Sequence, residues 1–317
     1  MIRDSNKFRD VELLVDDHKE RQRPSTGNVS TARIAIFTLP KPFTDPHIKL
    51  IQTNAIRSWS ALGSDVDVIL MGDDDGIDVA AKELNVRHHS SIRKNQQGTP
   101  ILSDAFRAAA ELSAAEILIY CNCDVILLKD LISSLELVQS HEAFESFVAF
   151  GRRVDLDVTT PIDFSDRSEI TCLLDDVEKR GSLAPIVCKE YFAFTRDQFR
   201  DIPDFAVGRG NWDNWMLASA KSIGVPVIDC SAMVKAVHQS HDYSHVKKSR
   251  LQVYVSGEEA KQNQKLAGGR NVIAGSTGSW LLTADGLQKK QMSWANKSFW
   301  ADLPRFLKMV VSFPFQR

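Results

Sequence analysis

The apolar residues of the first 130 positions fall alternately into continuous runs and into helical spacing. Continuous runs in ARIAIFTLP, DVDVILMG and AEILIYCNCDVILL predict buried strands, and VRHHSSI predicts a shorter one. Helical spacing predicts helices in DPHIKLIQTNAIRSWSAL, IDVAAKELN and LSDAFRAAAELSA. Asp45 is placed to cap the first of these helices, and Pro46 to begin it. This alternation is typical of a mostly parallel sheet covered by helices.

The second half of the chain has a more mixed pattern. SFVAFGRRVDLDV, KEYFAFTR, VPVIDCS and MVKAVHQ predict strands, and WDNWMLASAKSIG predicts a helix that ends at Gly224. After residue 246 the pattern weakens around the glycine-rich LAGGRNVIAGSTGS. In the last segment, WADLPRFLKMVVSFPFQR, Arg305, Lys308 and Arg317 flank apolar residues. We expect either a helix docked on the core or peripheral contact with a membrane surface, such as the inner membrane.

Composition narrows the class of protein. The chain of 317 residues, 43% hydrophobic and 25% charged, has room for one large α/β domain or two small ones. A formal net charge of -2 gives no electrostatic reason to expect nucleic acid as a partner. The N-terminal residues are polar, without the apolar run of a secretory signal, and the five cysteines lack a disulfide-rich spacing. We therefore expect a cytoplasmic protein with reduced, mostly buried cysteines; a zinc site at Cys121 and Cys123 would lack a second cysteine pair.

Polar residues follow three of the predicted strands. They form the loops Thr38–Lys41, Gly72–Asp75 and Asn122–Asp124. Ligands of parallel sheets bind beyond the carboxyl ends of the strands. Strand alternation would put Asn122 and Asp124 on one side, where Asp124 would hold a divalent cation that bridges two phosphates. The alternative is an ordinary turn or helix cap.

The run GRGNWDNW at 208–215 suits sugar binding. The faces of Trp212 and Trp215 would stack on a sugar ring, and Asp213 beside an indole would have a raised pKa and serve as general base. The alternative is a helix N-terminus capped by Asn211 or Asp213, with both tryptophans buried.

Histidines cluster in HQSHDYSH, at positions 238, 241 and 245. Neutral imidazole suits Mn²⁺ or Zn²⁺, so the cluster predicts a metal or phosphate site. A solvated loop is the alternative.

Taken together, these runs resemble the GT-A class of nucleotide-sugar-dependent glycosyltransferases. The resemblance is closest to a bacterial group with runs like TLPKPF, GTPILSDAF, YCNCDVILL, FAVGRGNWDNW, HQSHDYSH and GEEAKQNQKLAGG. It implies an α/β, Rossmann-like, mostly parallel central sheet flanked by helices, with a C-terminal lid or helical extension. The implied organisation is a tail at 1–28 and a single domain at 29–317. Within that domain, 29–130 would bind nucleotide, 131–250 acceptor, and 251–317 would form the lid and helices.

The resemblance also implies an activity and its residues. The activity is transfer of a sugar from a nucleotide-diphosphate sugar to a glycan or glycolipid acceptor, with inversion, as in polysaccharide biosynthesis. Asp124 with His238 or His241 would hold Mn²⁺ or Mg²⁺, and Asp213 would be the base. Asn122 stands where the class has the first Asp of its D-x-D signature, which puts direct coordination by Asn122 in doubt. The donor-binding residues would be Thr38, Pro40, Lys41, Asp73, Asp104, Asn122 and Arg270. The acceptor-binding residues would be Glu190, Trp212, Asn214 and Trp215, with Glu190 a rival base.

Three other activities fit parts of the sequence. A sugar-nucleotide pyrophosphorylase needs a glycine-rich basic loop after the first strand, whereas TLPKPF has one lysine and no glycine. A metal-dependent phosphoesterase would use the histidine cluster but needs more ligands at strand ends. A non-catalytic carbohydrate-binding protein would use Trp212 and Trp215.

Overall fold

Four parallel strands form the first half of a central sheet. β1 (Ile34–Thr38) lies between β2 (Val66–Met71) and β4 (Ile117–Cys121) and is parallel to both, and β3 (Arg87–His89) adds a further parallel strand beside β2. Every residue of β1, β2 and β4 is buried. Burial on both faces explains why these strands are continuous apolar runs rather than alternating ones.

The computed structural model describes residues 32–241, 252–269 and 277–290. The expected tail at 1–28, the C-terminal segment considered for membrane contact, and Arg270 lie outside this part of the chain. None of the helices in the described part is both long and apolar enough to cross a membrane.

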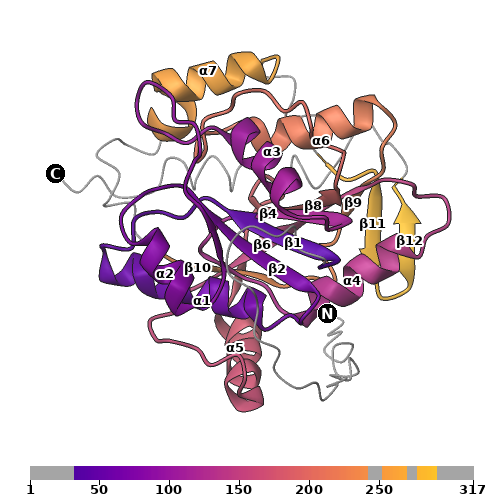
Figure 1. Cartoon of the computed structure of the whole chain (residues 1–317). Helices are drawn as coiled ribbons and strands as arrows, with labels where there is room; N and C mark the ends of the chain where they lie inside the picture. Colours follow the sequence, from indigo (N-terminus) through magenta and orange to yellow (C-terminus); the bar gives the residue numbers. More distant parts are fainter. Residues whose placement is uncertain (1–31, 242–251, 270–276, 291–317) are drawn as a thin grey trace.

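Helices cover both faces of the sheet (Figure 1). α1 (Pro46–Ser60), α2 (Ile77–Glu83) and α4 (Lys129–Gln139) contribute to the apolar core on one face. α3 (Leu102–Leu112) and α6 (Trp212–Ser222) contribute to the core on the other. The expected class, a mostly parallel sheet flanked by helices, is confirmed.

The start of α1 follows the expectation from its sequence. Asp45 accepts hydrogen bonds from the backbone N–H groups of His47 and Ile48, both at 2.9 Å, and Pro46 is the first helical residue. A proline loses no hydrogen bond at this position, because the first N–H groups of a helix have no partner within it.

Strands from the second half of the chain extend the same sheet. β8 (Lys189–Thr195) runs antiparallel between β4 and β6 (Val148–Leu156), and β9 (Val227–Asp229) is parallel to β6. β11 (Trp280–Thr283) and β12 (Gly286–Lys289) form a hairpin at the edge. The strand order is β12-β11-β9-β6-β8-β4-β1-β2-β3.

β6 belongs to two sets of pairings. Its register with β8 shifts between Gly151 and Arg152, and beyond this point β6 pairs with β7 (Ser182–Leu183) and, in parallel, with β10 (Ala236–Gln239). A Cβ on Gly151 would lie 2.7 Å from the Tyr191 hydroxyl, so no larger residue fits there without a shift. The break turns the end of β6 toward β10 and the candidate site.

The sequence predicted one long strand in AEILIYCNCDVILL, but the structure has two short ones. β4 ends at Cys121, a turn follows, and β5 (Val125–Ile126) pairs with β10 instead of continuing beside β1. The alternation argument that put Asn122 and Asp124 on one side is therefore wrong. α5 (Arg167–Arg180), which the apolar pattern did not indicate, packs with β5, β6 and β10 around a third apolar cluster.

Of the expected C-terminal extension, residues 252–269 are helical and docked on the core, whereas 277–290 hold the β11–β12 hairpin instead of a helix. α7 (Glu258–Leu266) follows one turn of π-helix at Gln252–Ser256. Glu259 accepts hydrogen bonds from Arg209 and Asn95 at 2.7 and 2.8 Å. Asn263 accepts from the Ala206 N–H and donates to its carbonyl.

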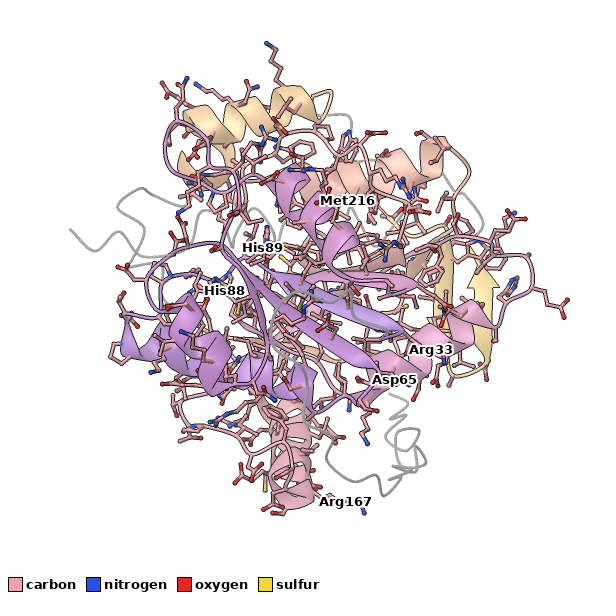
Figure 2. All side chains as sticks on the ribbon, viewed as in Figure 1. Arg33, Asp65, His88, His89, Arg167 and Met216 are labelled. Carbon is pink, nitrogen blue, oxygen red and sulfur yellow. The ribbon has the colours of Figure 1, made fainter. Side chains whose placement is uncertain are left out.

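The two ends of the parallel strands differ in chemistry. Figure 2 shows Arg33 and Asp65 together at the amino ends of β1 and β2, away from His88 and His89 at the carboxyl end of β3. A cavity of about 190 Å³ lies at the amino ends, between β1, β2 and α4, and so is remote from the carboxyl ends. All five cysteines are free thiols, and only Cys172 is exposed, as expected from the sequence.

Candidate functional site

Asp124 lies in the turn between β4 and β5, beyond the carboxyl end of β1. Its side chain is 13% exposed, and its Oδ1 atom is buried with no hydrogen-bond partner. A buried carboxylate oxygen without a partner is costly unless something else binds it. Burial alone would raise the pKa of Asp124, but a hydrogen bond with His241 and the charge of Lys41 hold the pKa well below its usual value. The carboxylate is therefore ionised and able to bind a cation.

His238 reaches the same place from β10. In the pairing of β10 with β5 it stands opposite Val125, the residue after Asp124, and in the pairing with β6 it stands opposite Asp155. Its Nδ1 atom lies 2.8 Å from Asp155 Oδ1. Because Asp155 is ionised, with a pKa that His238 and Arg153 lower against the effect of burial, this contact is satisfied by a proton on Nδ1. In the neutral ring with its proton on Nδ1, Nε2 is an acceptor that can bind a metal.

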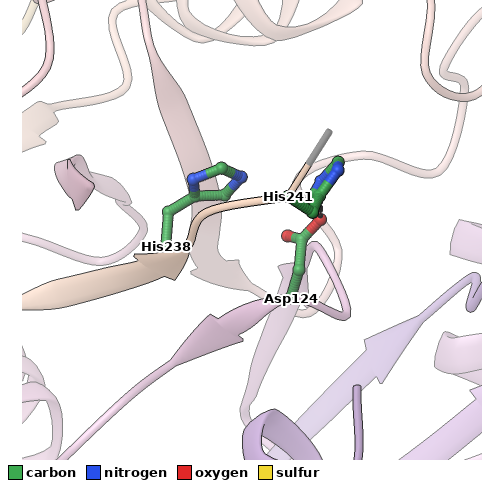
Figure 3. A group of neighbouring side chains, drawn as sticks. All are labelled: Asp124, His238 and His241. Atoms are coloured by element: carbon green, nitrogen blue, oxygen red, sulfur yellow. Dashed lines mark hydrogen bonds and ion pairs between the residues drawn. The ribbon is translucent and has the colours of Figure 1, made fainter. Parts of the chain in front are cut away.

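His241 completes a group of three. Its Nε2 atom lies 3.2 Å from Asp124 Oδ2, and its side chain is only 2% exposed. One ligand atom from each of Asp124, His238 and His241 lies within 4.8 Å of the other two. In Figure 3 the His241 ring stands over the Asp124 carboxylate, and His238 stands beside it at the end of β10.

A buried amide network holds the histidine segment against the Asp124 turn. The Gln239 backbone N–H donates to the Asp124 carbonyl at 3.1 Å, and the Gln239 side chain donates to the same carbonyl and to the Ile51 carbonyl. Asn54 donates to Gln239 Oε1 at 3.1 Å and accepts from the Ile162 N–H. Gln239 and Asn54 are fully buried, so these contacts fix how closely Asp124 and the histidines approach.

This set of ligands suits a divalent transition metal. One carboxylate oxygen and two imidazole nitrogens favour Mn²⁺ over Mg²⁺, which prefers oxygen ligands. The unpaired Asp124 Oδ1 and the hydrogen bond that His238 donates to Asp155 are both features of metal sites, in which a carboxylate often orients the ligating histidine. The residues present therefore fit a metal ion.

Lys41 places a positive charge beside the same group. Its Nζ atom lies 3.3 Å from His241 Nε2 and 3.8 Å from Asp124 Oδ2. The backbone of the loop is held by Gln52, whose side chain accepts from the Lys41 N–H at 2.7 Å and donates to the Lys41 carbonyl at 2.9 Å.

Asn122 and Glu190 form a second polar group next to the first. Asn122 donates to one Glu190 carboxylate oxygen and Arg153 binds the other. Arg153 Nε also lies 2.9 Å from Asp155 Oδ1, so an unbroken chain of charged contacts joins Glu190 to His238. With both oxygens engaged, Glu190 is better arranged to position other groups than to take a proton.

Asp213, in the first turn of α6, has a different environment. Removal from water raises its pKa, and the positive charge of Lys189 partly opposes that effect. Lys189 is buried, and its Nζ donates to Asn214 Oδ1 at 3.1 Å. Burial also lowers the pKa of Lys189. An aspartate with a raised pKa at a helix start beyond the strand ends has the properties of a general base.

The two tryptophans do not share one role. Trp212 is buried, with its ring 5.2 Å from Tyr120 and 5.4 Å from Phe192, so its faces belong to the core, as in the alternative considered for this run. Trp215 is only partly buried and packs edge-on against Phe205. α6 is preceded by Asn211 in the left-handed conformation, with φ 81°, and no side chain caps it.

Other residues expected to bind the donor are buried or are paired with other groups. Thr38 and Pro40 are buried. Asp73 pairs with Lys94 at 2.6 Å, which lowers the pKa of Asp73. Asp104 accepts from the Arg93 N–H at 2.7 Å. Asp73 and Asp104 thus hold the segment around residues 93 and 94 in place.

Four residues of the site were not singled out from the sequence: Arg153, Asp155, Lys189 and Gln239. Arg153 and Asp155 lie two apart in GRRVDLDV, within a strand that begins fully buried. Two charged residues in a buried strand are rare unless they are paired, and this was the signal by which the sequence could have indicated them. Lys189 belongs to no motif, and Gln239 lies within HQSHDYSH, where only the histidines suggested a role.

Comparisons with known proteins add little. No protein-family model matches the chain, and no curated protein matches it in sequence. Among solved structures, glucosyl-3-phosphoglycerate synthase from Mycobacterium tuberculosis in complex with Mn²⁺, UDP-glucose and phosphoglyceric acid is 15% identical, with a TM-score of 0.45 over 83% of this chain and 88% of that chain. The same enzyme in another crystal structure is 13% identical, with a TM-score of 0.44 over 83% and 89%. At these values the likeness carries no conclusion about activity, and the architecture stands on the strand order and pairing described above.

Proposed function

We propose that this chain is a metal-dependent glycosyltransferase of the GT-A class, which moves a sugar from a nucleotide-diphosphate sugar to an acceptor hydroxyl. The observation that carries the proposal is the convergence of Asp124, His238 and His241, with ligand atoms within 4.8 Å of one another, in a site next to the carboxyl ends of parallel strands. Parallel sheets bind nucleotides at this edge.

The donor half of the site would use three ligands and one lysine. Asp124, His238 and His241 would hold Mn²⁺ or Mg²⁺, which supplies neutralisation of the negative charge that develops on the departing diphosphate. Lys41 lies within 3.8 Å of Asp124 and would bind a phosphate oxygen. The loop that carries Pro40 and Lys41 would therefore follow the diphosphate.

The acceptor half would centre on Asp213. Its carboxylate would take the proton of an acceptor hydroxyl as the acceptor oxygen forms a bond to the anomeric carbon of the donor. The bond between that carbon and the diphosphate oxygen breaks, and its electron pair leaves with the diphosphate. This single displacement inverts the anomeric configuration. Lys189 keeps part of the Asp213 population ionised, because its positive charge lowers the pKa of Asp213.

The acceptor would be positioned by residues around the Asn122–Glu190 pair. Glu190, Asn214 and the partly buried Trp215 are the candidates for contact with hydroxyl groups and a sugar face. A glycan or glycolipid is the acceptor class that the sequence resemblance implies.

The test combines binding with turnover. The full chain is screened by thermal shift with UDP-, GDP-, dTDP- and CMP-linked sugars, each with and without Mn²⁺, and release of free nucleotide is measured for any ligand that stabilises it. We expect one donor class to raise the melting temperature only with Mn²⁺, and Asp124→Ala to abolish the shift. Asp285→Ala, at an exposed position in the β11–β12 turn, is the matched control.

Two outcomes would contradict the proposed function. If well-folded protein shows no shift with any donor but hydrolyses an aryl phosphate in the presence of Mn²⁺, the site is a phosphoesterase centre and the proposal is wrong. Binding of free glycan that needs neither donor nor metal would instead indicate a carbohydrate-binding protein.

A further inference from the structure

Lys41 combines a fixed backbone with a mobile charge. Gln52, which is 2% exposed, binds both the N–H and the carbonyl of Lys41, so this point of the loop cannot shift without breaking two buried hydrogen bonds. The Lys41 side chain is 35% exposed. Its four methylene groups allow the ammonium group to reach different partners from one anchored position.

The ammonium group lies against two of the three potential metal ligands. Nζ is 3.3 Å from His241 Nε2 and 3.8 Å from Asp124 Oδ2, and these two atoms are 3.2 Å apart. One ring nitrogen cannot accept a hydrogen bond from Lys41 and donate one to Asp124 at the same time. In the tautomer with a proton on Nε2, this nitrogen donates to Asp124, and in the tautomer that can bind a metal, the nitrogen and the carboxylate oxygen are both acceptors. In both tautomers the Lys41 ammonium is the cation beside the Asp124 carboxylate.

A divalent ion on the same two atoms would compete with Lys41. Like charges repel strongly at this separation near a protein surface, and the ion carries two charges. The ammonium group must therefore move away when the ion binds. The anion that arrives with the donor is a diphosphate, and lysine binds phosphate well as a point charge.

We propose that Lys41 is an exchangeable counter-cation, which balances the charge of Asp124 beside His241 before metal binds and transfers to the diphosphate when metal and nucleotide bind together. This inference rests on the proposed function and goes beyond it, because it makes binding of the two ligands cooperative. Metal alone has to displace Lys41 from its partners, whereas metal with diphosphate gives Lys41 a new one. Each ligand then raises the affinity for the other by the same factor.

The experiment measures Mn²⁺ affinity with and without a diphosphate. Mn²⁺ is titrated into the full chain and followed by electron paramagnetic resonance of the free ion, with inorganic pyrophosphate as the probe and a protein-free blank for the complex in solution. Lys41→Met keeps the length of the side chain and removes its charge, and Lys41→Arg keeps the charge. Lys49→Met, at an exposed position on α1, is the matched control.

The expected result has opposite signs in the two conditions. Without pyrophosphate, Lys41→Met binds Mn²⁺ more tightly than the unaltered chain, while Lys49→Met and Lys41→Arg do not. With pyrophosphate the advantage disappears or reverses. Coupling between two ligands is typically about 5- to 150-fold, and we expect the coupling of the unaltered chain to fall in this range and that of Lys41→Met to approach one.

Two results would overturn the inference, and they are distinguishable. If Mn²⁺ binds the unaltered chain and Lys41→Met equally well, or more weakly to Lys41→Met, Lys41 does not compete with the metal, and the proposed function stands without the exchange. If Mn²⁺ does not bind the unaltered chain in either condition, the metal centre itself is wrong, and the proposed function fails with it.

Discussion

His238 stands directly opposite Asp155 in the parallel pairing of β10 with β6, with 2.8 Å between His238 Nδ1 and the Asp155 carboxylate. The same histidine stands opposite Val125 in the antiparallel pairing with β5, next to Asp124. Two backbone registers therefore determine which histidine nitrogen faces the Asp124 carboxylate.

Asp155 should control metal affinity without contacting the metal. Asp155→Ala removes the acceptor that holds the His238 ring, and loss of such a partner typically weakens metal binding by about 10- to 100-fold. Asp155→Asn should have a smaller effect, because its amide oxygen still accepts from Nδ1. Mn²⁺ titration measures this, with the exposed Asp157→Ala as control. Unchanged Mn²⁺ affinity in Asp155→Ala would exclude His238 as a ligand.

Lys189 should set the pH dependence of turnover through Asp213. The charge of Lys189 lowers the pKa of Asp213, against the larger effect of burial. Lys189→Met removes that charge, so the pKa of Asp213 rises and a smaller fraction is ionised at a given pH. The acid limb of the kcat profile should therefore move to higher pH, whereas Lys189→Arg should leave it near its original position. An acid limb that stays in place in Lys189→Met would contradict the role of Asp213 as base.

Gln239 should matter for stability. Gln239→Leu keeps a side chain of similar size but leaves the Ile51 carbonyl and Asn54 without their hydrogen-bond partner. A buried polar group without a partner costs about 1–3 kcal/mol. The free energy of unfolding from urea denaturation should fall by at least that amount, and the exposed Gln262→Leu should change it little. Equal free energies of unfolding for the two variants would show that the hydrogen bonds of Gln239 do not stabilise the fold.

Asp130 gives a prediction for stability against pH. One of its oxygens accepts from the Lys235 N–H at 2.8 Å, and the other is buried without a partner. Burial raises the pKa of Asp130 from its ordinary value of 3.8 to about 6. The carboxyl group therefore favours the folded state most below pH 3.8, and this contribution is lost as the pH rises through about 6.

The measurement compares Asp130→Asn with the unaltered chain. The asparagine does not titrate, so the unaltered chain should lose stability relative to the variant as the pH rises, by about 3 kcal/mol across this window. Asp201→Asn, at an exposed position, is the control. A stability difference that does not change with pH would place the pKa of Asp130 at its ordinary value.

Local signals in the sequence were sufficient for much of the fold. The Asp45–Pro46 start of α1 and the continuous apolar run of β1 each depend on residues next to one another in the chain, and the structure has both. Asp124 was placed with His238 or His241 only through the resemblance to the GT-A class. What a run of apolar residues cannot show is a change of partner, so the end of β4 and the start of β5 were read as one strand.

The site residues that the sequence did not indicate depend on contacts between segments that are far apart in the chain. Asp155 and His238 are 83 positions apart and meet through the pairing of β6 with β10, for which neither segment carries a local signal. Lys189 looked like an ordinary charge at the start of a strand, although it is buried beside Asn214. Trp212 was ambiguous for the same reason, since its burial depends on Tyr120 and Phe192.

The irregularity of β6 at Gly151 and Arg152 has a consequence for how damage to this protein would be detected. The first part of the strand is built into the main sheet, and the last part carries Asp155 toward β10. A substitution at Gly151 that straightened the strand would leave most of the core pairing intact while moving Asp155, the partner of His238, relative to Asp124. Such a variant would pass an ordinary test of folding and fail a metal titration, so Mn²⁺ affinity reports the curvature of this strand more sensitively than a melting temperature does.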